Sequence, residues 1–527
     1  MVSHTLGTVV ALMRTASSVL AHLDFGNEAG DDVDADELLE YFVEQQAFKK
    51  FLDPRNRLLV ATARKGVGKS ALLKWTAIKV QKQDPEALVV AVRGADLVRN
   101  KFSLSSTLNN ASDYTHDWMI RLCALVNRQL ALRLKLALTD DQITLVETAE
   151  LEGYKSRNFI SSLTERLQSL LEKGRGITKI PIKDEIEIFR RVKDRKVWIV
   201  IDDLDATFQN TVAESLSLAG FFSACRYLIQ DVTGLYIRAS VRTDVWALLK
   251  RYDESLDKMS QYVSEILWHQ KEFLALLAFR IRASLKQSGN KIPKSPSYSS
   301  PEDVQEHLLA LAFEPKMQWG SYRRQPSPMQ PSLSPPRLVD SYKIIYTLSY
   351  ERPRWAIQLC KLSQEAALRR GAPRIDKQSI DEVWGEYGAK RIEDLVAEHK
   401  HQCPQVNELL NAFRSANRVM TRAELFQWIK NRVSEHLEVK IEGEPTRAPQ
   451  DVARFLYRMG FIVARSENPA GEYEHYRFDQ MSDFLLARTD DDFKVKWEIH
   501  PCYREALDIR KLNQSHRKRF SSLRRRR

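Results

Sequence analysis

The sequence contains no long uninterrupted apolar run. None of its windows approaches the roughly 18 consecutive apolar residues that a membrane-spanning helix requires, so no membrane segment is predicted. The apolar stretch 6–23 is interrupted by Arg14 and His22, and no basic segment precedes it, which argues against a signal peptide. Cysteine is also scarce. Five cysteines stand among 527 residues without paired spacing, which predicts reduced thiols and a cytoplasmic protein.

Acidic residues are absent from the stretch 510–527, and this absence explains most of the positive charge of the chain. The stretch carries nine Lys or Arg residues, and without them the net charge falls from +12 to +3. A basic tail of this kind is typical of segments that contact a polyanion. The alternatives are a tail that keeps the protein soluble and a handle for a protein partner.

Residues 58–74 show the pattern of a phosphate-binding P-loop. An apolar strand ending at Ala63 is followed by a glycine turn and then by a helix that begins near Lys69. Lys69 can reach the β- and γ-phosphates of a nucleotide, and the Ser70 hydroxyl can bind Mg²⁺. Ala63 departs from the motif G-x-x-x-x-G-K-[ST], which places a glycine there, and the alternative is a chance glycine turn. The predicted nucleotide-binding residues are Arg64, Lys65, Gly66, Val67, Gly68, Lys69, Ser70 and Ala71.

A second diagnostic stretch is the apolar run 197–201, which follows Lys196 and ends in Asp202 and Asp203. A strand buried on both faces presents such carboxylates at its carboxyl end. We expect Asp202 to hold Mg²⁺ through water and Asp203 to polarise the attacking water. Asp205 is interpreted differently, as the cap of the next helix.

A third strand, predicted over 234–241, ends in Arg242. Arg242 is the first candidate for contact with the γ-phosphate or the attacking water, and Ser240 is the second. The alternative is that Arg242 forms a surface salt bridge. A further strand is expected over 263–268, followed by a helix over 272–285.

The rest of the chain divides by composition. Nine of its 19 prolines fall between Pro293 and Pro336, with only one helix expected there, over 302–313. Another helical stretch, 342–370, contains Arg352-Pro353-Arg354 at a helix start, where two cations indicate a nearby anion. The predicted regions are 1–45, an acidic and helical lead-in; 46–286, the P-loop core with a helical insertion at about 95–194; 287–340, a linker and lid edge; 341–400, a helical lid; 401–509, a winged-helix-like module; and 510–527, the basic tail.

The winged-helix-like module is predicted from the order of its elements. Helices over 408–418 and 421–436 and a helical segment at 448–460 precede two alternating strands, 461–465 and 472–478, around an Asn-Pro-Ala-Gly turn. Modules with this order bind DNA or serve as packing and partner modules, and the sequence leaves both roles open.

These motifs together resemble AAA+/STAND-type P-loop NTPases, in particular the bacterial KAP-type and origin-recognition-like ATPases. The likeness covers about residues 25–390 and the winged-helix-like end. It implies an α/β fold with a P-loop NTPase αβα core and a helical lid, with ATP and Mg²⁺ as cofactors. It also implies that Arg242 is the polar end of the sensor strand and that Arg354 is the lid arginine. Many bacterial proteins of this build serve phage defence or DNA transactions.

The leading functional hypothesis is therefore an ATP-hydrolysing switch whose nucleotide state is transmitted to the C-terminal module or to a partner. Its catalytic residues would be Asp203, Arg242 and Arg354, and its metal ligands Ser70 and Asp202. A first rival is a DNA-binding regulator with a weak or vestigial ATPase. A second is a GTP-binding module, for which no base-specifying N-K-x-D signature is found. The expected partners are nucleic acid, through the basic tail and the module, and a second copy or another protein.

Overall fold

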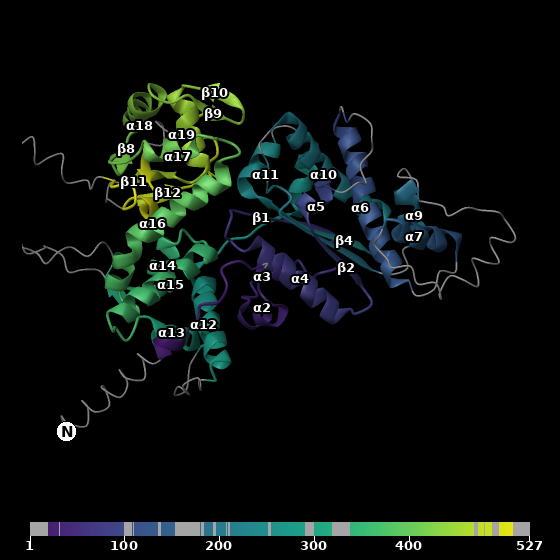
Figure 1. Ribbon diagram of the computed structural model, residues 1–527, viewed down its shortest axis with the longest axis horizontal. Helices are drawn as coiled ribbons and strands as arrows, with labels where there is room; N and C mark the ends of the chain where they lie inside the picture. Colours follow the sequence, from purple (N-terminus) through teal and green to yellow (C-terminus); the bar gives the residue numbers. More distant parts are fainter. Residues whose placement is uncertain are drawn as a thin grey trace, which may run out of the picture. The chain divides into compact units, whose positions relative to one another are not determined.

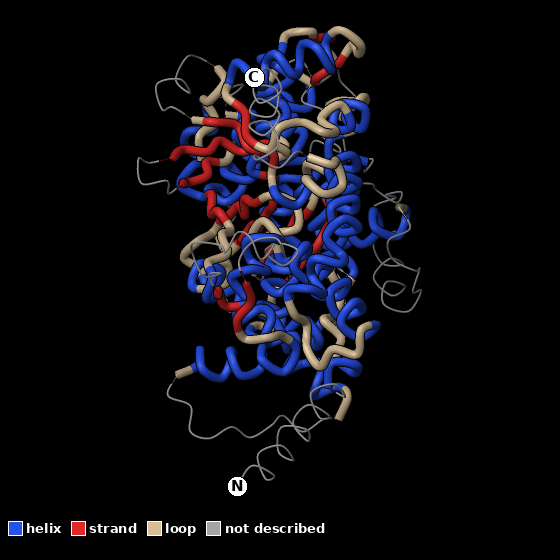
Figure 2. The backbone as a smooth tube through the Cα atoms, turned by 90° about the vertical axis from the view of Figure 1, so that its left-hand side faces the viewer, coloured by secondary structure: helices blue, strands red, loops and turns tan. Residues whose placement is uncertain are grey.

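A computed structural model of the chain describes residues 19–30, 32–99, 108, 110–134, 139–152, 180, 184–192, 196–206, 208, 211–250, 254–289, 300–318, 338–467, 473–478, 480–486 and 495–509. These residues belong to two compact units. One comprises 44–64 and 69–266, and the other comprises 1–43, 65–68 and 267–527. Figure 1 labels the elements, and Figure 2 colours the helices and strands. The model contains no helix among the described residues that is long and apolar enough to span a membrane.

The first of these units, 44–64 with 69–266, is built on a five-stranded sheet whose neighbouring strands are all parallel. Its strand order is β2-β3-β4-β1-β5. The order places β4 between β1, which leads into the P-loop, and β3, which ends in the paired acids. The prediction of an α/β core is confirmed. The strands are β1 (Leu58–Ala63), β2 (Leu88–Arg93), β3 (Val197–Asp202), β4 (Leu235–Arg242) and β5 (Val263–Glu265).

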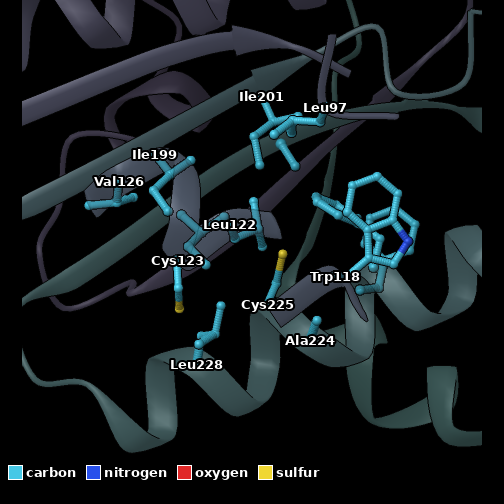
Figure 3. Close-up of a cluster of buried hydrophobic side chains, with 14 of the residues drawn as sticks. Leu97, Trp118, Leu122, Cys123, Val126, Ile199, Ile201, Ala224, Cys225 and Leu228 are labelled. Carbon is cyan, nitrogen blue, oxygen red and sulfur yellow. The ribbon is translucent and has the colours of Figure 1, made fainter. Parts of the chain in front are cut away.

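Helices pack against both faces of this sheet. Helix α4 (Lys69–Gln83) contacts β1 to β4, whereas α6 (Ala111–Arg133) and α10 (Val212–Asp231) contact each other and the sheet. Successive β3 residues alternate between the two layers, as a pleated strand requires. Ile199 and Ile201 join the core formed with α6 and α10 (Figure 3), while Trp198 packs with Tyr236 and Val80 of α4. This double burial explains the continuous apolar run that the sequence shows.

The predicted helical insertion contains α6, α7 (Asp140–Leu151) and α9 (Glu185–Val192). Its polar centre is the buried Arg128, whose guanidinium lies 2.8 Å from Glu152 and 2.6 Å from Glu185. Because an unpaired buried charge is costly, the two carboxylates hold the three helical segments in one arrangement. Residues 153–179 of this predicted insertion lie outside the described residues. Shorter elements of this unit are α3 (Gln46–Lys49), α5 (Gly94–Arg99), α11 (Thr243–Leu249) and the 3-10 helix η2 (Glu254–Tyr262).

In the other unit, the N-terminal segment packs on α12 (Gln270–Gln287). Arg280 of α12 is buried, donates to the carbonyl oxygens of Phe25 and Asn27 and stacks 4.2 Å from the ring of Tyr41. Tyr41 belongs to α2 (Ala35–Tyr41), so one arginine ties two N-terminal pieces to the helix. The expected helix at 302–313 is α13 (Pro301–Ala312), and a hairpin of β6 (Lys316–Gln318) and β7 (Leu338–Asp340) was not anticipated.

The segment 341–400, predicted as a helical lid, contains three helices: α14 (Ser341–Leu348), α15 (Pro353–Arg369) and α16 (Lys377–His399). The sequence predicts one helical stretch over 342–370, and this is wrong at 349–352. Tyr350 and Glu351 there adopt positive φ angles of 57° and 59°, which an α-helix does not contain. The expected helix start at Arg352-Pro353-Arg354 is confirmed, because α15 begins at Pro353.

The C-terminal module combines short helices with a four-stranded antiparallel sheet in the order β12-β11-β13-β8. The predicted hairpin is confirmed by the pairing of β11 (Ile462–Glu467) with β12 (Tyr473–Tyr476). The helix expected over 408–418 ends early, at Asn411. The remaining elements are α17 (Val406–Asn411), β8 (Val419–Met420), α18 (Arg422–Ile429), the π-helix η3 (Lys430–Ser434), β9 (Val439–Ile441), β10 (Glu444–Thr446), α19 (Pro449–Arg458), β13 (Lys496–Ile499) and η4 (Pro501–Tyr503).

Candidate nucleotide site

The P-loop connects the end of β1 to the start of α4, and its glycines adopt conformations that other residues rarely take. Gly66 has φ 79° and Gly68 has φ 114°. At such angles a Cβ atom is strained, so the glycines are required by the backbone itself. Ala63, where the motif expects a glycine, is the last residue of β1 and is buried.

Hydrogen bonds fix the direction of the loop peptides. The backbone N–H of Arg354 donates to the Gly66 carbonyl over 3.2 Å, and the indole N–H of Trp268 donates to the Val67 carbonyl over 2.8 Å. In a trans peptide the C=O and the following N–H point in opposite directions. The N–H groups of Val67 and Gly68 are therefore turned away from these two donors, as an anion cradle needs.

Lys69 is buried at the first position of α4. Its ammonium donates to the carbonyl oxygen of Ala63 over 3.1 Å. The cation is thereby held beside the loop at the N-terminal end of a 15-residue helix, where the helix dipole also favours an anion. Ser70 and Ala71 follow in the first turn of the same helix and are partly exposed.

The two acids at the end of β3 differ in their surroundings. Asp202 is half-buried, and its carboxylate accepts a hydrogen bond from the hydroxyl of Ser240 on the neighbouring strand β4. Asp203 is exposed and has a positive φ of 53°, a conformation that costs a non-glycine residue energy. The structure thus holds Asp202 through the Ser240 hydroxyl and places Asp203 on a strained turn.

Gly94 is the neighbour that shapes this turn. A Cβ atom at Gly94 would lie 2.2 Å from the Cα of Leu204, so no larger residue fits beside the segment that follows Asp203. No sequence pattern marks this glycine, because only the parallel pairing of β2 with β3 brings the two strand ends together. Ser240 was proposed for a different role, a direct contact with phosphate or water.

Arg242 is engaged with a carboxylate. Its Nε atom and its backbone N–H both lie 2.9 Å from one oxygen of Asp205, and both residues are buried. Asp205, which is predicted to cap a helix, accepts two hydrogen bonds from Arg242 at the end of β4. Arg354 is the second residue of α15 and is partly exposed, and among the described residues its buried Nε atom has no hydrogen-bond partner.

The donor set for a metal ion is small. The described residues contain no group of three or more His, Cys, Asp or Glu side chains placed to hold a metal. The Ser70 hydroxyl and the Asp202 carboxylate are nevertheless oxygen donors of the kind that Mg²⁺ prefers, and Mg²⁺ commonly takes few protein ligands beside phosphate and water. These two residues therefore fit a nucleotide-linked Mg²⁺ better than a protein-enclosed metal.

The solved structures that resemble the chain cover most of it, but their sequence identities and TM-scores are low. No curated protein matches the chain significantly. The ORC2 protein of Aeropyrum pernix, solved in ADPNP–ADP complexes, is 10% identical, with 90% of this chain and 96% of that chain covered and a TM-score of 0.41. Cdc6p of Pyrobaculum aerophilum is 14% identical at the same coverages, with a TM-score of 0.27. A family model described as the FunZ-associated C-terminal helical domain matches residues 332–396, the segment that holds β7, α14, α15 and most of α16.

Proposed function

We propose that the protein binds ATP with Mg²⁺ at the P-loop and hydrolyses it as a conformational switch. The observation that carries the proposal is the loop itself: Gly66 and Gly68 have positive φ angles, Lys69 is held beside the loop, and a parallel sheet leads into it. Loops of this geometry use their backbone N–H groups and a lysine to bind phosphates.

The acids after β3 supply the chemistry in this proposal. Asp202, oriented by Ser240, would hold Mg²⁺ together with Ser70, and the exposed Asp203 would orient the attacking water. When bound, Mg²⁺ neutralises the charge that develops on the phosphates. Arg354 is proposed to contact phosphate during turnover. Its backbone N–H donates to the Gly66 carbonyl, and its Nε atom has no hydrogen-bond partner among the described residues. The pairing of Arg242 with Asp205 supports a role in holding β4 to the Asp203 turn.

Titration with a fluorescent ATP analogue tests the proposal. Lys69→Ala is expected to weaken binding strongly, since a charge-assisted contact contributes about 1.5–3 kcal/mol, which is roughly 10- to 150-fold in affinity. Lys82→Ala is the matched control, because Lys82 is an exposed lysine of the same helix. Equal affinity in both variants and the parent would show that the loop is not the nucleotide site.

We further propose that the C-terminal module is winged-helix-like and is used for packing or partner contact. Its order β8, α18, α19, β11 and β13, with β13 between β11 and β8, supports the fold assignment. The helix before the wing, α19, buries half of its residues, and its one exposed residue, Asp451, is acidic. The negative charge of Asp451 would be repelled by the phosphates of DNA, which favours a protein partner for this helix.

A further inference from the structure

The turn between α14 and α15 is backbone-strained. Tyr350 and Glu351 have φ angles of 57° and 59°, so two consecutive non-glycine residues adopt the left-handed conformation. Such residues persist only where their surroundings hold them. Local bonds contribute, since the Glu351 N–H donates to the Tyr346 carbonyl over 3.0 Å, but a bond of this kind usually ends a helix with glycine in the left-handed position.

The C-terminal module supplies the additional contacts. The ring of Tyr350 lies 3.9 Å, centroid to centroid, from the ring of His500, and the Glu351 carboxylate lies 2.6 Å from the guanidinium of Arg477. Gly460 also lies against Tyr350, because a Cβ atom at Gly460 would lie 3.5 Å from the Tyr350 ring. Both left-handed residues are thus held by residues more than a hundred positions later in the chain.

The same turn positions the start of α15 on the P-loop. Arg354 follows Glu351 by three residues, and its N–H donates to the Gly66 carbonyl. The approach is close, since a Cβ atom at Gly66 would lie 3.3 Å from the Cβ of Arg354. A rotation of the turn would therefore move the donor that fixes the Gly66 peptide.

We propose that Arg477 and His500 are positioning residues for the nucleotide site and act by holding the strained Tyr350–Glu351 turn. The inference rests on the proposed ATP binding and adds its regulation, by the state of the C-terminal module. Because coupling between two sites is reciprocal, a ligand that shifts the module changes ATP affinity, and ATP changes the affinity for that ligand by the same factor.

Glu351→Ala and Glu351→Gly distinguish the effect of backbone strain from the effect of losing the ion pair with Arg477. Both remove the contact with Arg477, but glycine adopts positive φ without strain, whereas alanine does not. ATP affinity is expected to fall at least about fivefold in Glu351→Ala and to stay within about twofold of the parent in Glu351→Gly. Arg477→Ala should resemble Glu351→Ala. Arg414→Ala is the matched control, since Arg414 forms a 2.8 Å ion pair with Asp508 in the same module.

Hydrogen–deuterium exchange of the peptide 350–356 gives a readout that needs no nucleotide. Exchange at the Arg354 amide should quicken in Glu351→Ala and Arg477→Ala and stay near the parent rate in Glu351→Gly and Arg414→Ala. Equal exchange in the alanine and glycine variants, or in Arg477→Ala and Arg414→Ala, would overturn the inference. A parent protein that binds no ATP would refute the proposed function instead, and the exchange rates would still decide on the turn.

Discussion

At the scale of single residues, the contact between Gly94 and Leu204 determines where the Asp203 turn lies. Gly94→Ala would place a methyl group 2.2 Å from a backbone atom, so the turn must shift. We expect the free energy of unfolding to fall by about 1–3 kcal/mol, as in other overpacked sites, and ATP hydrolysis to fall with it. Chemical denaturation and a steady-state phosphate-release assay measure the two effects.

Gly385→Ala is the control for this substitution. Its Cβ atom would lie 3.6 Å from Glu505, an ordinary contact, and Gly385 lies inside α16. Alanine in a helix interior is favoured over glycine by roughly 1 kcal/mol, so this variant should be as stable as the parent or more stable. If Gly94→Ala behaves like Gly385→Ala, the close approach does not constrain the turn.

The two acids after β3 are expected to respond differently to neutralisation. Asp203→Asn should bind ATP normally, because asparagine tolerates the left-handed conformation that Asp203 adopts, but should hydrolyse it about 10²- to 10⁴-fold more slowly. Asp202→Asn should weaken Mg²⁺-dependent binding. Nucleotide titration with and without Mg²⁺, paired with turnover measurements, distinguishes them. Equal loss of binding in both variants would contradict this division of roles.

At the scale of whole elements, the sequence predicts the buried strands well and the polar connections poorly. Strands β1 and β3 are continuous apolar runs because both of their faces are covered. β4 was also predicted, although it carries Arg238, which is buried, donates to the carbonyl oxygens of Phe51 and Asp53 and lies 4.7 Å from the Trp198 ring. The turn at 349–352 lacks glycine and is held by distant residues, so the local pattern located the helix start at Pro353 but not the left-handed residues before it.

The same limit applies to the sheet of the C-terminal module. The strand β13 was not predicted, although Val495, Trp497 and Ile499 alternate with polar residues. What this pattern cannot show is that Glu498 is buried, because the cations that make its burial possible lie elsewhere in the sequence. Burial alone would raise the pKa of Glu498, but the hydrogen bond with His475 and the charges of Arg504, Arg465 and Arg418 outweigh it and hold the pKa well below its usual range.

This carboxylate predicts an acid-dependent stability. A lowered folded-state pKa stabilises the protein above the unfolded value of about 4.3, and that stability is lost as the pH falls toward the folded-state pKa. Glu498→Gln should cost about 3 kcal/mol at pH 7, because it removes the buried counter-charge of the buried Arg465 and of the partly exposed Arg418 and Arg504. Urea unfolding between pH 7 and pH 3 should show a smaller loss of stability in the variant than in the parent.

Asp508→Asn is the matched control for Glu498→Gln. Asp508 pairs with Arg414, and its side chain is 69% exposed. Exposed pairs of this kind contribute about 0–1 kcal/mol. A parent whose stability does not depend on pH between 5 and 3, or a Glu498→Gln variant no weaker than Asp508→Asn, would show that the cluster does not stabilise the module.

At the scale of the whole molecule, the chain joins its N-terminal segment to its second half. From the sequence, residues 1–45 are predicted only as an acidic and helical lead-in, and their charge indicates no specific partner. The structure places the Asp24 N–H 2.7 Å from the Ser284 hydroxyl and the Glu28 carboxylate beside the Gln358 amide. Contacts between such distant positions depend on the path of the backbone, which no local periodicity encodes.

The basic tail, residues 510–527, lies outside the described residues, and its function remains a prediction from the sequence. Nine cations without an acid should engage a polyanion, and contacts to phosphates carry no base information. For duplex DNA each neutralised phosphate contributes about −0.9 to the slope of log K against log salt, so full engagement gives at most roughly −8. We therefore expect sequence-tolerant DNA binding that weakens steeply with salt.

Deletion of 510–527 tests whether the tail is the source of this binding. The truncated protein should bind DNA more weakly and with a shallower salt slope, because up to nine phosphate contacts are removed. ATP affinity is the internal control and should not change, since the P-loop contacts described above involve no residue of the tail. If the intact chain binds no DNA at low salt, or if affinity and slope survive the deletion, the tail serves solubility or a protein partner instead.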